Sequence, residues 1–350
     1  MQERELLVWG QPTLAQKRLL QAAVEKSEKA IAYWQEWSEL VDIETLDSES
    51  YRLLPLLYRN LSQYEISDRS LVKLKGVYRR TWCENQLIFK HLTEILQQFK
   101  SASIPSLLIK DAALCLLHYS DIGERMINNF EILVGSQDAV KAMTLLAKMG
   151  WKSKKPIGDR LSPSDCVMEF TNQANLQLML RWHLFWDNFS ETLERSFWHR
   201  AQEVSVGDTF TQVLHPRDQL FYVCVGGGIR NPVFPLVRLA DAHRILESDA
   251  AEIDGDELCD RANTFRFLLP FQNFIKAFEE IFEVPFINST VCASKTLPIS
   301  AFEQQEWHCW HANSRSLFNR LQNKYFVYQR RYGAPEYQVN WVKFLTTLKS

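Results

Sequence analysis

The spacing of apolar residues changes at Ser101, and this change limits the chain to a fold that mixes helices with a sheet. Before it, residues from Thr13 to Phe99 follow a helical pattern, with apolar side chains three to four positions apart in a long helix that we expect to begin near Asp68. After it, the apolar runs are short and separated by turns, as expected for buried strands. A helical N-terminal region therefore leads into a core that contains a sheet.

Four short apolar runs predict the strands of this core, at residues 104–109, 130–134, 166–170 and 176–182. A helix over 111–118 separates the first two strands. A second helix over 137–149 follows, with Ser136 as its cap and Gly150 at its end. The last two runs predict a hairpin, and the second of them alternates apolar and polar residues. We expect a small mixed sheet with helices packed against one face.

The remainder of the chain returns to a mostly helical pattern. Ser190 or Asn188 can cap a helix, a strand pair is expected around Gly207, and further helices run from Pro216 to a last one at 340–350. The predicted fold class is α+β, with a small mixed sheet flanked by helical regions. The predicted boundaries are an N-terminal helical region at 1–100, an α/β core at 101–213 and a C-terminal helical region at 214–350.

Composition excludes several functional classes. The net charge is −2 and charged residues make up 23% of the chain, so no basic field indicates nucleic-acid binding. Seven cysteines without a CxxC pair indicate reduced thiols in a cytoplasmic protein. The sequence has neither a signal-peptide core nor an apolar run of about 18 residues. We expect a soluble cytoplasmic protein that binds neither nucleic acid nor membrane.

Three ordered motifs lie in the predicted core. They are Leu-Ile-Lys-Asp-Ala-Ala-Leu at 108–114, Arg-Met-Ile-Asn-Asn-Phe-Glu-Ile-Leu-Val at 125–134 and Gly-Trp at 150–151. They resemble a bacterial family, the uncharacterised nucleotidyltransferases, whose pattern is Leu-Leu-Lys-Gly-Ala-Ala-Leu, Arg-x-x-x-Asp-Ile-Asp-Leu-Leu-Val and Gly-Trp or Gly-Tyr. Later matches at 179–184, 197–201 and 213–246 extend the resemblance from Ile104 to about Phe286. The resemblance implies a nucleotidyltransferase-like core.

The departures from that pattern fall on the residues of nucleotidyl transfer. The family pattern implies two Mg²⁺ ions held by the Asp-x-Asp pair and by the acid of a later Glu-Leu-His-Trp strand. Here these positions are Asn129, Glu131 and Met179, and the glycine after the lysine is Asp111. Mg²⁺ prefers anionic oxygen ligands, which a thioether cannot supply. The sequence therefore predicts no metal site, no cofactor and no ordinary nucleotidyl transfer.

Basic residues remain in the same motifs. Lys110 and Arg125 match the family, and Arg181 stands where the family has histidine. We expect them, with Asn129 and Met179, to bind the substrate in a cleft of net positive character. A carboxylate or phosphate suits such a cleft, because a guanidinium binds either group through two parallel hydrogen bonds. The predicted partner is an anionic small molecule.

Acid–base function in this cleft is assigned to Glu131, Asp111 and His183, with pKa values tuned by partial burial. The leading hypothesis is a repurposed, metal-independent enzyme of biosynthetic small-molecule metabolism. One alternative is a residual Mg/ATP-dependent nucleotidyltransferase that uses Asp111 and Glu131 as its metal pair. The other is a noncatalytic binding or scaffold protein, in which these side chains only hold a polar cleft together.

Two other motifs are weaker candidates for a functional site. Residues 226–230 contain three glycines but lack the Lys-Ser/Thr of a phosphate loop, so we expect a helix end there. His308 and His311 lie within one helical turn and have no second ligand cluster nearby. An ordinary aromatic helix face is expected instead of a metal site.

Overall fold

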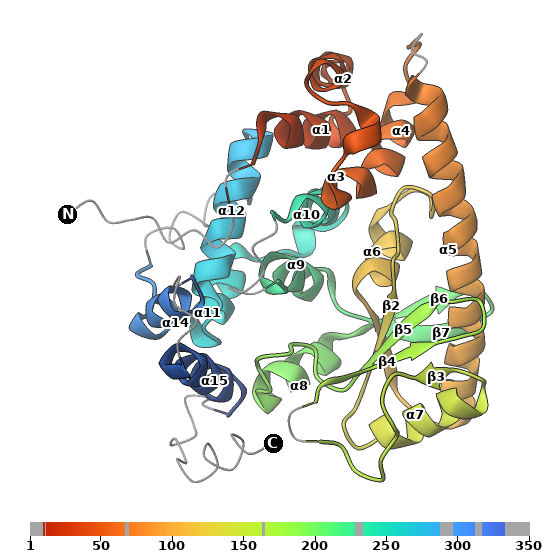
Figure 1. Cartoon of the computed structure of the whole chain (residues 1–350), viewed down its shortest axis with the longest axis vertical. Helices are drawn as coiled ribbons and strands as arrows, with labels where there is room; N and C mark the ends of the chain where they lie inside the picture. Colours follow the sequence, from red (N-terminus) through yellow and green to blue (C-terminus); the bar gives the residue numbers. More distant parts are fainter. Residues whose placement is uncertain are drawn as a thin grey trace.

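The computed structural model describes residue 10 and residues 12–66, 70–162, 165–227, 234–287, 297–311 and 317–332. The expected mixture of helices and a mixed sheet is confirmed. In Figure 1 the N-terminal helices lie at the top, the sheet at the lower right and the C-terminal helices on the left. The long helix α5 (Ser70–Ser101) runs down the right side and joins the N-terminal helices to the sheet.

The sheet has seven strands among the described residues, in the order β3-β4-β5-β2-β1-β7-β6. Their bounds are β1 Ser106–Ile109, β2 Phe130–Val134, β3 Lys152–Ser153, β4 Val167–Thr171, β5 Gln177–Arg181, β6 Gln202–Val206 and β7 Thr209–Val213. The central pair β1–β2 is antiparallel, whereas β2–β5 and β1–β7 are parallel. All four expected strands are confirmed. The expected pair around Gly207 is confirmed too, and it joins this same sheet beside β1.

The helices that surround the sheet fall into three groups. Those before α5 are α1 (Leu14–Val24), α2 (Lys29–Leu40), α3 (Ser48–Arg52) and α4 (Leu54–Leu61). Those within the predicted core are α6 (Lys110–His118), α7 (Ala139–Lys148) and α8 (Glu191–Arg200). The C-terminal ones are α9 (Pro216–Val225), α10 (Leu236–Asp249), α11 (Gly255–Thr264), α12 (Leu268–Phe282), α14 (Ala301–His311) and α15 (Leu317–Tyr332). The expected helix starting near Asp68 and the expected last helix at 340–350 involve positions outside the described residues.

The helix ends follow the sequence in most places. The Ser190 hydroxyl accepts a hydrogen bond from the Leu193 amide at 3.4 Å, as a cap does. Gly150, with φ of 89°, follows α7 as expected. The expected cap at Ser136 is wrong, because a turn hydrogen bond from Asp138 N to Gly135 O delays the start of α7 to Ala139.

Helices cover both faces of the sheet, so the expectation of a single covered face is wrong. Successive strand residues point to opposite faces. Leu108 and Ile132, paired across β1 and β2, pack in the core that α5 and α7 share. Leu107 and Leu133, the neighbouring pair, pack in a second core built largely from N-terminal and C-terminal helices. All five residues of β2 are buried, so elements pack against both faces of this strand.

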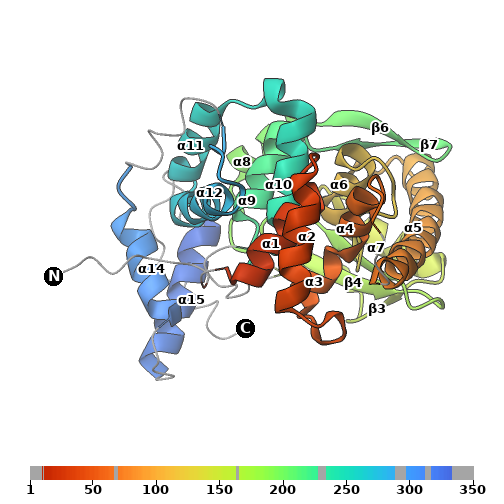
Figure 2. The same cartoon turned by 90° about the horizontal axis from the view of Figure 1, so that it is seen from above.

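The three predicted regions share this second core. Helix α1 packs against α2 and α10, and seen from above these helices lie between α5 on one side and α12 on the other (Figure 2). Leu19 of α1, Leu133 of β2 and Phe274 of α12 belong to the same apolar cluster. No helix of the described residues has the length and apolar character needed to cross a membrane.

Candidate functional site

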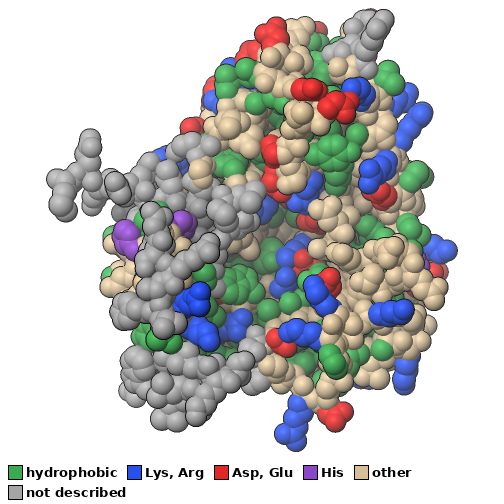
Figure 3. All heavy atoms as spheres, viewed as in Figure 1, with side chains coloured by type: hydrophobic (Ala, Val, Ile, Leu, Met, Phe, Trp, Pro, Cys, Tyr) green, Lys and Arg blue, Asp and Glu red, His purple; other side chains and the backbone are tan. Residues whose placement is uncertain are grey.

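A cavity of about 310 Å³ lies where β1 ends and α6 begins, bordered by α3, α9 and α10. On the face drawn in Figure 3, basic and acidic side chains lie next to each other between the N-terminal helices and the sheet. We call this cavity the cleft. Its lining residues are Glu49, Arg52, Lys110, Asp111, Leu114, Arg125, Asn128, Asn129, Glu131, Tyr222, Val223, Gly226, Gly227, Phe234, Pro235, Val237, Arg238 and Asp241.

Glu131 of β2 is held between two cations at the base of the cleft. It is only 4% exposed, and Lys110 Nζ donates to its Oε1 at 2.7 Å while Arg181 Nε donates to its Oε2. Arg181 reaches it because β5 runs parallel to β2 in register, so that Arg181 pairs with Leu133 and shares the face of Glu131. Both oxygens of this carboxylate are therefore neutralised by bases.

Burial and charge act in opposite directions on the two bases. Burial would lower the pKa of Arg181, but the adjacent Glu131 carboxylate outweighs it, and the pKa is raised. Burial would likewise lower the pKa of Lys110. Tyr222, whose ring centroid lies 5.7 Å from Lys110 Nζ, and Glu131 outweigh it, so this pKa is raised too. Both bases are thus held in their charged forms.

Arg125 organises a second group of charges beside the first. Its guanidinium donates to Asp111 Oδ1 at 2.9 Å and to the two oxygens of Asp241 at 2.8 and 3.0 Å. The other oxygen of Asp111 accepts from Arg52 Nη2 at 3.0 Å. The Tyr119 hydroxyl donates to Asp241 at 2.6 Å. Asp111, like Glu131, therefore faces two cations.

These residues do not fit the two-metal site that the fold family implies. A metal there would need anionic oxygens directed at one point. Asn129 and Met179 supply no anionic oxygen, and both oxygens of Glu131 are bonded to cations. Across the part of the chain that the structure describes, no group of three or more His, Cys, Asp or Glu side chains can hold a metal ion.

The backbone at the cleft is strained at one position. Lys110 joins β1 to α6 with φ of 58°, a left-handed conformation that costs a side-chain-bearing residue about 1–3 kcal/mol and often marks functional sites. The glycine motif borders the same cleft. Gly226 follows α9, which confirms the expected helix end, and a Cβ on Gly227 would lie 2.7 Å from an Arg238 nitrogen. Residues 228–230 of that motif lie outside the described residues.

The structure brings together five of the eight residues expected at the site: Lys110, Asp111, Arg125, Asn129 and Glu131 all line the cleft. Arg181 does not line the cleft, but it donates a hydrogen bond to Glu131, which does. Met179 lies next to Glu131 in the strand register, also outside the lining. His183 lies elsewhere, stacked on Phe189 at 4.0 Å with Nδ1 2.8 Å from Glu194.

The structure adds cleft residues that the sequence did not suggest. Arg52 and Glu49 come from α3, in a region with no motif to connect it to the core. Tyr222, Arg238 and Asp241 come from α9 and α10. Of these, only Asp241 had a signal, because it matches a Leu-x-Asp setting of the family pattern.

Comparison with known proteins places the chain in a family. Residues 35–283 match the family model described as uncharacterised nucleotidyltransferase. No curated protein matches the chain. The match begins well before Ile104 and so includes α3 and its Arg52.

Two solved structures show distant similarity. One is an antigenic nucleotidyltransferase-like protein from Paracoccidioides brasiliensis, with 11% identity, a TM-score of 0.35, and coverage of 56% of this chain and 96% of that chain. The other is an H. pylori protein assigned as a nucleotidyltransferase, with 11% identity, a TM-score of 0.34, and coverage of 73% and 99% respectively.

Proposed function

The chain belongs to the uncharacterised nucleotidyltransferase family, and we propose that its cleft acts without a bound metal on a small anionic metabolite. One observation carries the proposal. Glu131 stands at a position where the family pattern has a metal-binding aspartate, and here it is bonded to Lys110 and Arg181. Two cations thus bond to the residue at the position where the family pattern has a metal-binding acid.

Three groups can receive the anion. The side chains of Lys110 and Arg52 line the cleft and are 25% and 20% exposed. The Asn129 side chain also lines the cleft and supplies an uncharged amide that can donate to an anion.

Anion binding can also supply a base. If the ligand draws the Lys110 ammonium toward itself, Glu131 Oε1 loses its hydrogen bond to Lys110, while the bond of Glu131 to Arg181 remains. That oxygen then faces the ligand across the cleft and can accept a proton from it. Lys110 would bind the anion, Glu131 would act as the base, and Arg181 would hold Glu131 in position.

Thermal unfolding with nucleotide tests metal independence. A ligand that binds only the folded protein raises its stability, by about 2.7 kcal/mol at 100 times Kd. We expect ATP with Mg²⁺ to give no larger shift in Tm than ATP with EDTA. A Mg²⁺-dependent shift would restore the alternative of a residual Mg/ATP-dependent nucleotidyltransferase.

Substitution of the proposed catalytic pair tests the site once a reaction is found. Glu131→Gln removes the base and Arg181→Ala removes the cation that positions it, and each should abolish turnover. The matched control is Glu169→Gln on β4, whose carboxylate bonds to exposed Lys154 instead. Full activity in both cleft variants would mean that the active site lies outside the cleft.

One observation favours a second candidate, a noncatalytic binding protein. The four carboxylates that line the cleft are all bonded to cations: Glu49 and Asp111 to Arg52, Asp111 and Asp241 to Arg125, and Glu131 to Lys110. A cleft without a free base can hold an anion and leave it unchanged. This candidate predicts anion binding without turnover for every metabolite tested.

A further inference from the structure

The lining of the cleft combines charged and amide side chains with apolar ones. The residues that supply the apolar part are Leu114, Tyr222, Val223, Phe234, Pro235 and Val237. Ligand pockets commonly combine an apolar wall with a few polar groups that fix orientation. A fully polar ligand would leave this wall without a partner, so the ligand should carry an apolar body.

The charge balance of the cleft limits the charge of its ligand. Five cations, Arg52, Lys110, Arg125, Arg181 and Arg238, line it or bond to its carboxylates. Four carboxylates, Glu49, Asp111, Glu131 and Asp241, oppose them. Among the described residues this leaves one positive charge in excess. A single negative charge is therefore balanced, whereas a triphosphate would leave several charges uncompensated without metal ions.

The volume of the cleft agrees with a small ligand. About 310 Å³ stands at the lower end of the range of about 300–1,000 Å³ that is typical of small-molecule pockets. Resting on the proposed function, we infer that the ligand is a monocarboxylate with a compact apolar or aromatic body. Its carboxylate lies against Arg52 and Lys110, and its body lies against Phe234 and Val237.

Arg52 is the residue that selects the carboxylate. A planar guanidinium matches a carboxylate better than an ammonium does. The position of Arg52 is fixed by the start of α3, where the Asp47 side chain accepts from the amides of Glu49 and Ser50 at 3.0 Å each. The N-terminal helices thus supply a specificity residue to a cleft whose other charged residues, apart from Glu49 of α3, come from the sheet, from α6 and α10 and from the loop before β2.

Calorimetric titration with probe compounds in EDTA tests the ligand class. The probes are phenylacetate, acetate, phenylacetamide, phenyl phosphate and ATP. We expect phenylacetate to bind at least 10-fold more tightly than acetate, which lacks the body, and than phenylacetamide, which lacks the charge. Equal affinity for acetate and phenylacetate would overturn the apolar side of the inference, and tight binding of phenylacetamide would overturn the charged side.

Two variants test which residues contact the carboxylate and the apolar body of the ligand. Arg52→Gln should weaken phenylacetate binding at least 10-fold, whereas Arg80→Gln, a matched change at an exposed arginine of α5, should not alter it. Phe234→Ala should weaken phenylacetate without affecting any binding of acetate. If Phe234→Ala does not fold, as judged by circular dichroism, Phe234→Leu gives the same test with less loss of volume. Unchanged binding in Arg52→Gln would overturn the role of Arg52.

The outcomes separate this inference from the proposed function. Tight, metal-independent binding of phenyl phosphate but not phenylacetate would overturn the monocarboxylate and leave the anionic metabolite standing. Binding of ATP only when Mg²⁺ replaces EDTA would overturn the proposed function itself. If phenylacetate binds and Arg52→Gln abolishes this binding, both the inference and the proposed function are supported.

Discussion

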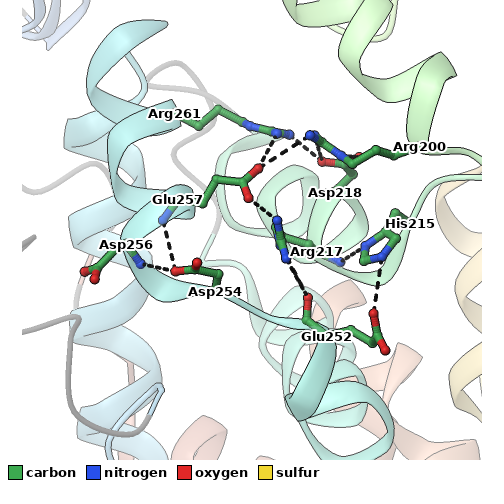
Figure 4. A network of polar contacts seen from close by, with 9 residues as sticks. All are labelled: Arg200, His215, Arg217, Asp218, Glu252, Asp254, Asp256, Glu257 and Arg261. Carbon is green, nitrogen blue, oxygen red and sulfur yellow. Dashed lines mark hydrogen bonds and ion pairs between the residues drawn. The ribbon is translucent and has the colours of Figure 1, made fainter.

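Of two ion networks among the described residues, one borders the cavity and the other does not. The cleft network consists of Lys110, Glu131 and Arg181. The helix network, drawn in Figure 4, consists of Arg200, Arg217, Asp218, Glu257 and Arg261, from α8, α9 and α11. In it Asp218 accepts from Arg200 at 2.8 Å and from Arg261, and Glu257 accepts from Arg261 at 2.9 Å and from Arg217.

The difference lies in what each carboxylate faces. Asp218 is completely buried, and the helix network around it cross-links three helices without lining the cavity. Its outer members Arg200 and Glu257 are 28% and 35% exposed, but they lie away from the cleft. In the cleft network, Glu131 is buried but Lys110 is 25% exposed and lines the cavity. The same ion pairing can therefore serve packing in one region and ligand binding in the other, and what distinguishes the two uses is contact with the cavity.

The largest expected effect is on stability, in the helix network. Asp218→Ala should lower the free energy of unfolding by about 3–5 kcal/mol, because it leaves Arg200 and Arg261 without their buried partner. Urea denaturation measures the loss. Asp256→Ala, a change at an exposed position of α11, should cost at most about 1 kcal/mol. A loss below 1 kcal/mol for Asp218→Ala would mean that this network does not hold the helices together.

A smaller loss of stability is expected in the cleft network. Glu131→Ala leaves Arg181 without its partner, but Lys110 can turn toward the cavity and regain water, so the change should cost about 1–3 kcal/mol. The same change raises the excess positive charge of the cleft, so phenyl phosphate should bind more tightly at low salt. Urea denaturation and calorimetric titration measure the two effects. A stability loss as large as that of Asp218→Ala, with no gain in anion binding, would remove the distinction between the networks.

The sequence predicted the core of the fold well because the strands carry local signals. Short apolar runs bounded by turns placed β1, β2, β4 and β5 to within about two residues. The packing on the second face was missed because it depends on contacts between distant segments. Leu133, for instance, packs in one cluster with residues of α1 and α12, and no local pattern shows this.

The candidate site was predicted in part, for the same reason. Residues of contiguous motifs, such as Lys110 and Glu131, come together because adjacent strands carry them. His183 was placed at the site because it follows β5 in sequence, but the chain turns it toward Glu194. Arg52 could not be predicted, since only the folded chain brings α3 to Asp111. The charge of the cleft likewise depends on residues from three regions.

The smallest expected effect tests the helix that joins the two networks. Helix α9 carries Asp218 in the helix network and Tyr222 at the cleft, one turn apart. Between them, the Gln219 side chain bonds to His118 of α6 at 2.9 Å. Burial lowers the pKa of His118 and outweighs Gln219, Asp249 and Asp241, which act in the opposite direction.

Protonation of His118 should therefore loosen this junction. The unfolded chain gains a proton below pH of about 6.5, while folded His118 gains it only at lower pH, so stability should fall as the pH falls from 6.5. A single group contributes at most about 1.4 kcal/mol per pH unit. Urea denaturation between pH 7 and pH 5 should show that the free energy of unfolding falls less in His118→Gln than in the unsubstituted protein. His243, whose pKa burial also lowers, should add to the effect in the double variant with His243→Gln. If the free energy of unfolding falls with pH as steeply in both variants as in the unsubstituted protein, the junction is insensitive to protonation. The two networks would then respond to pH independently.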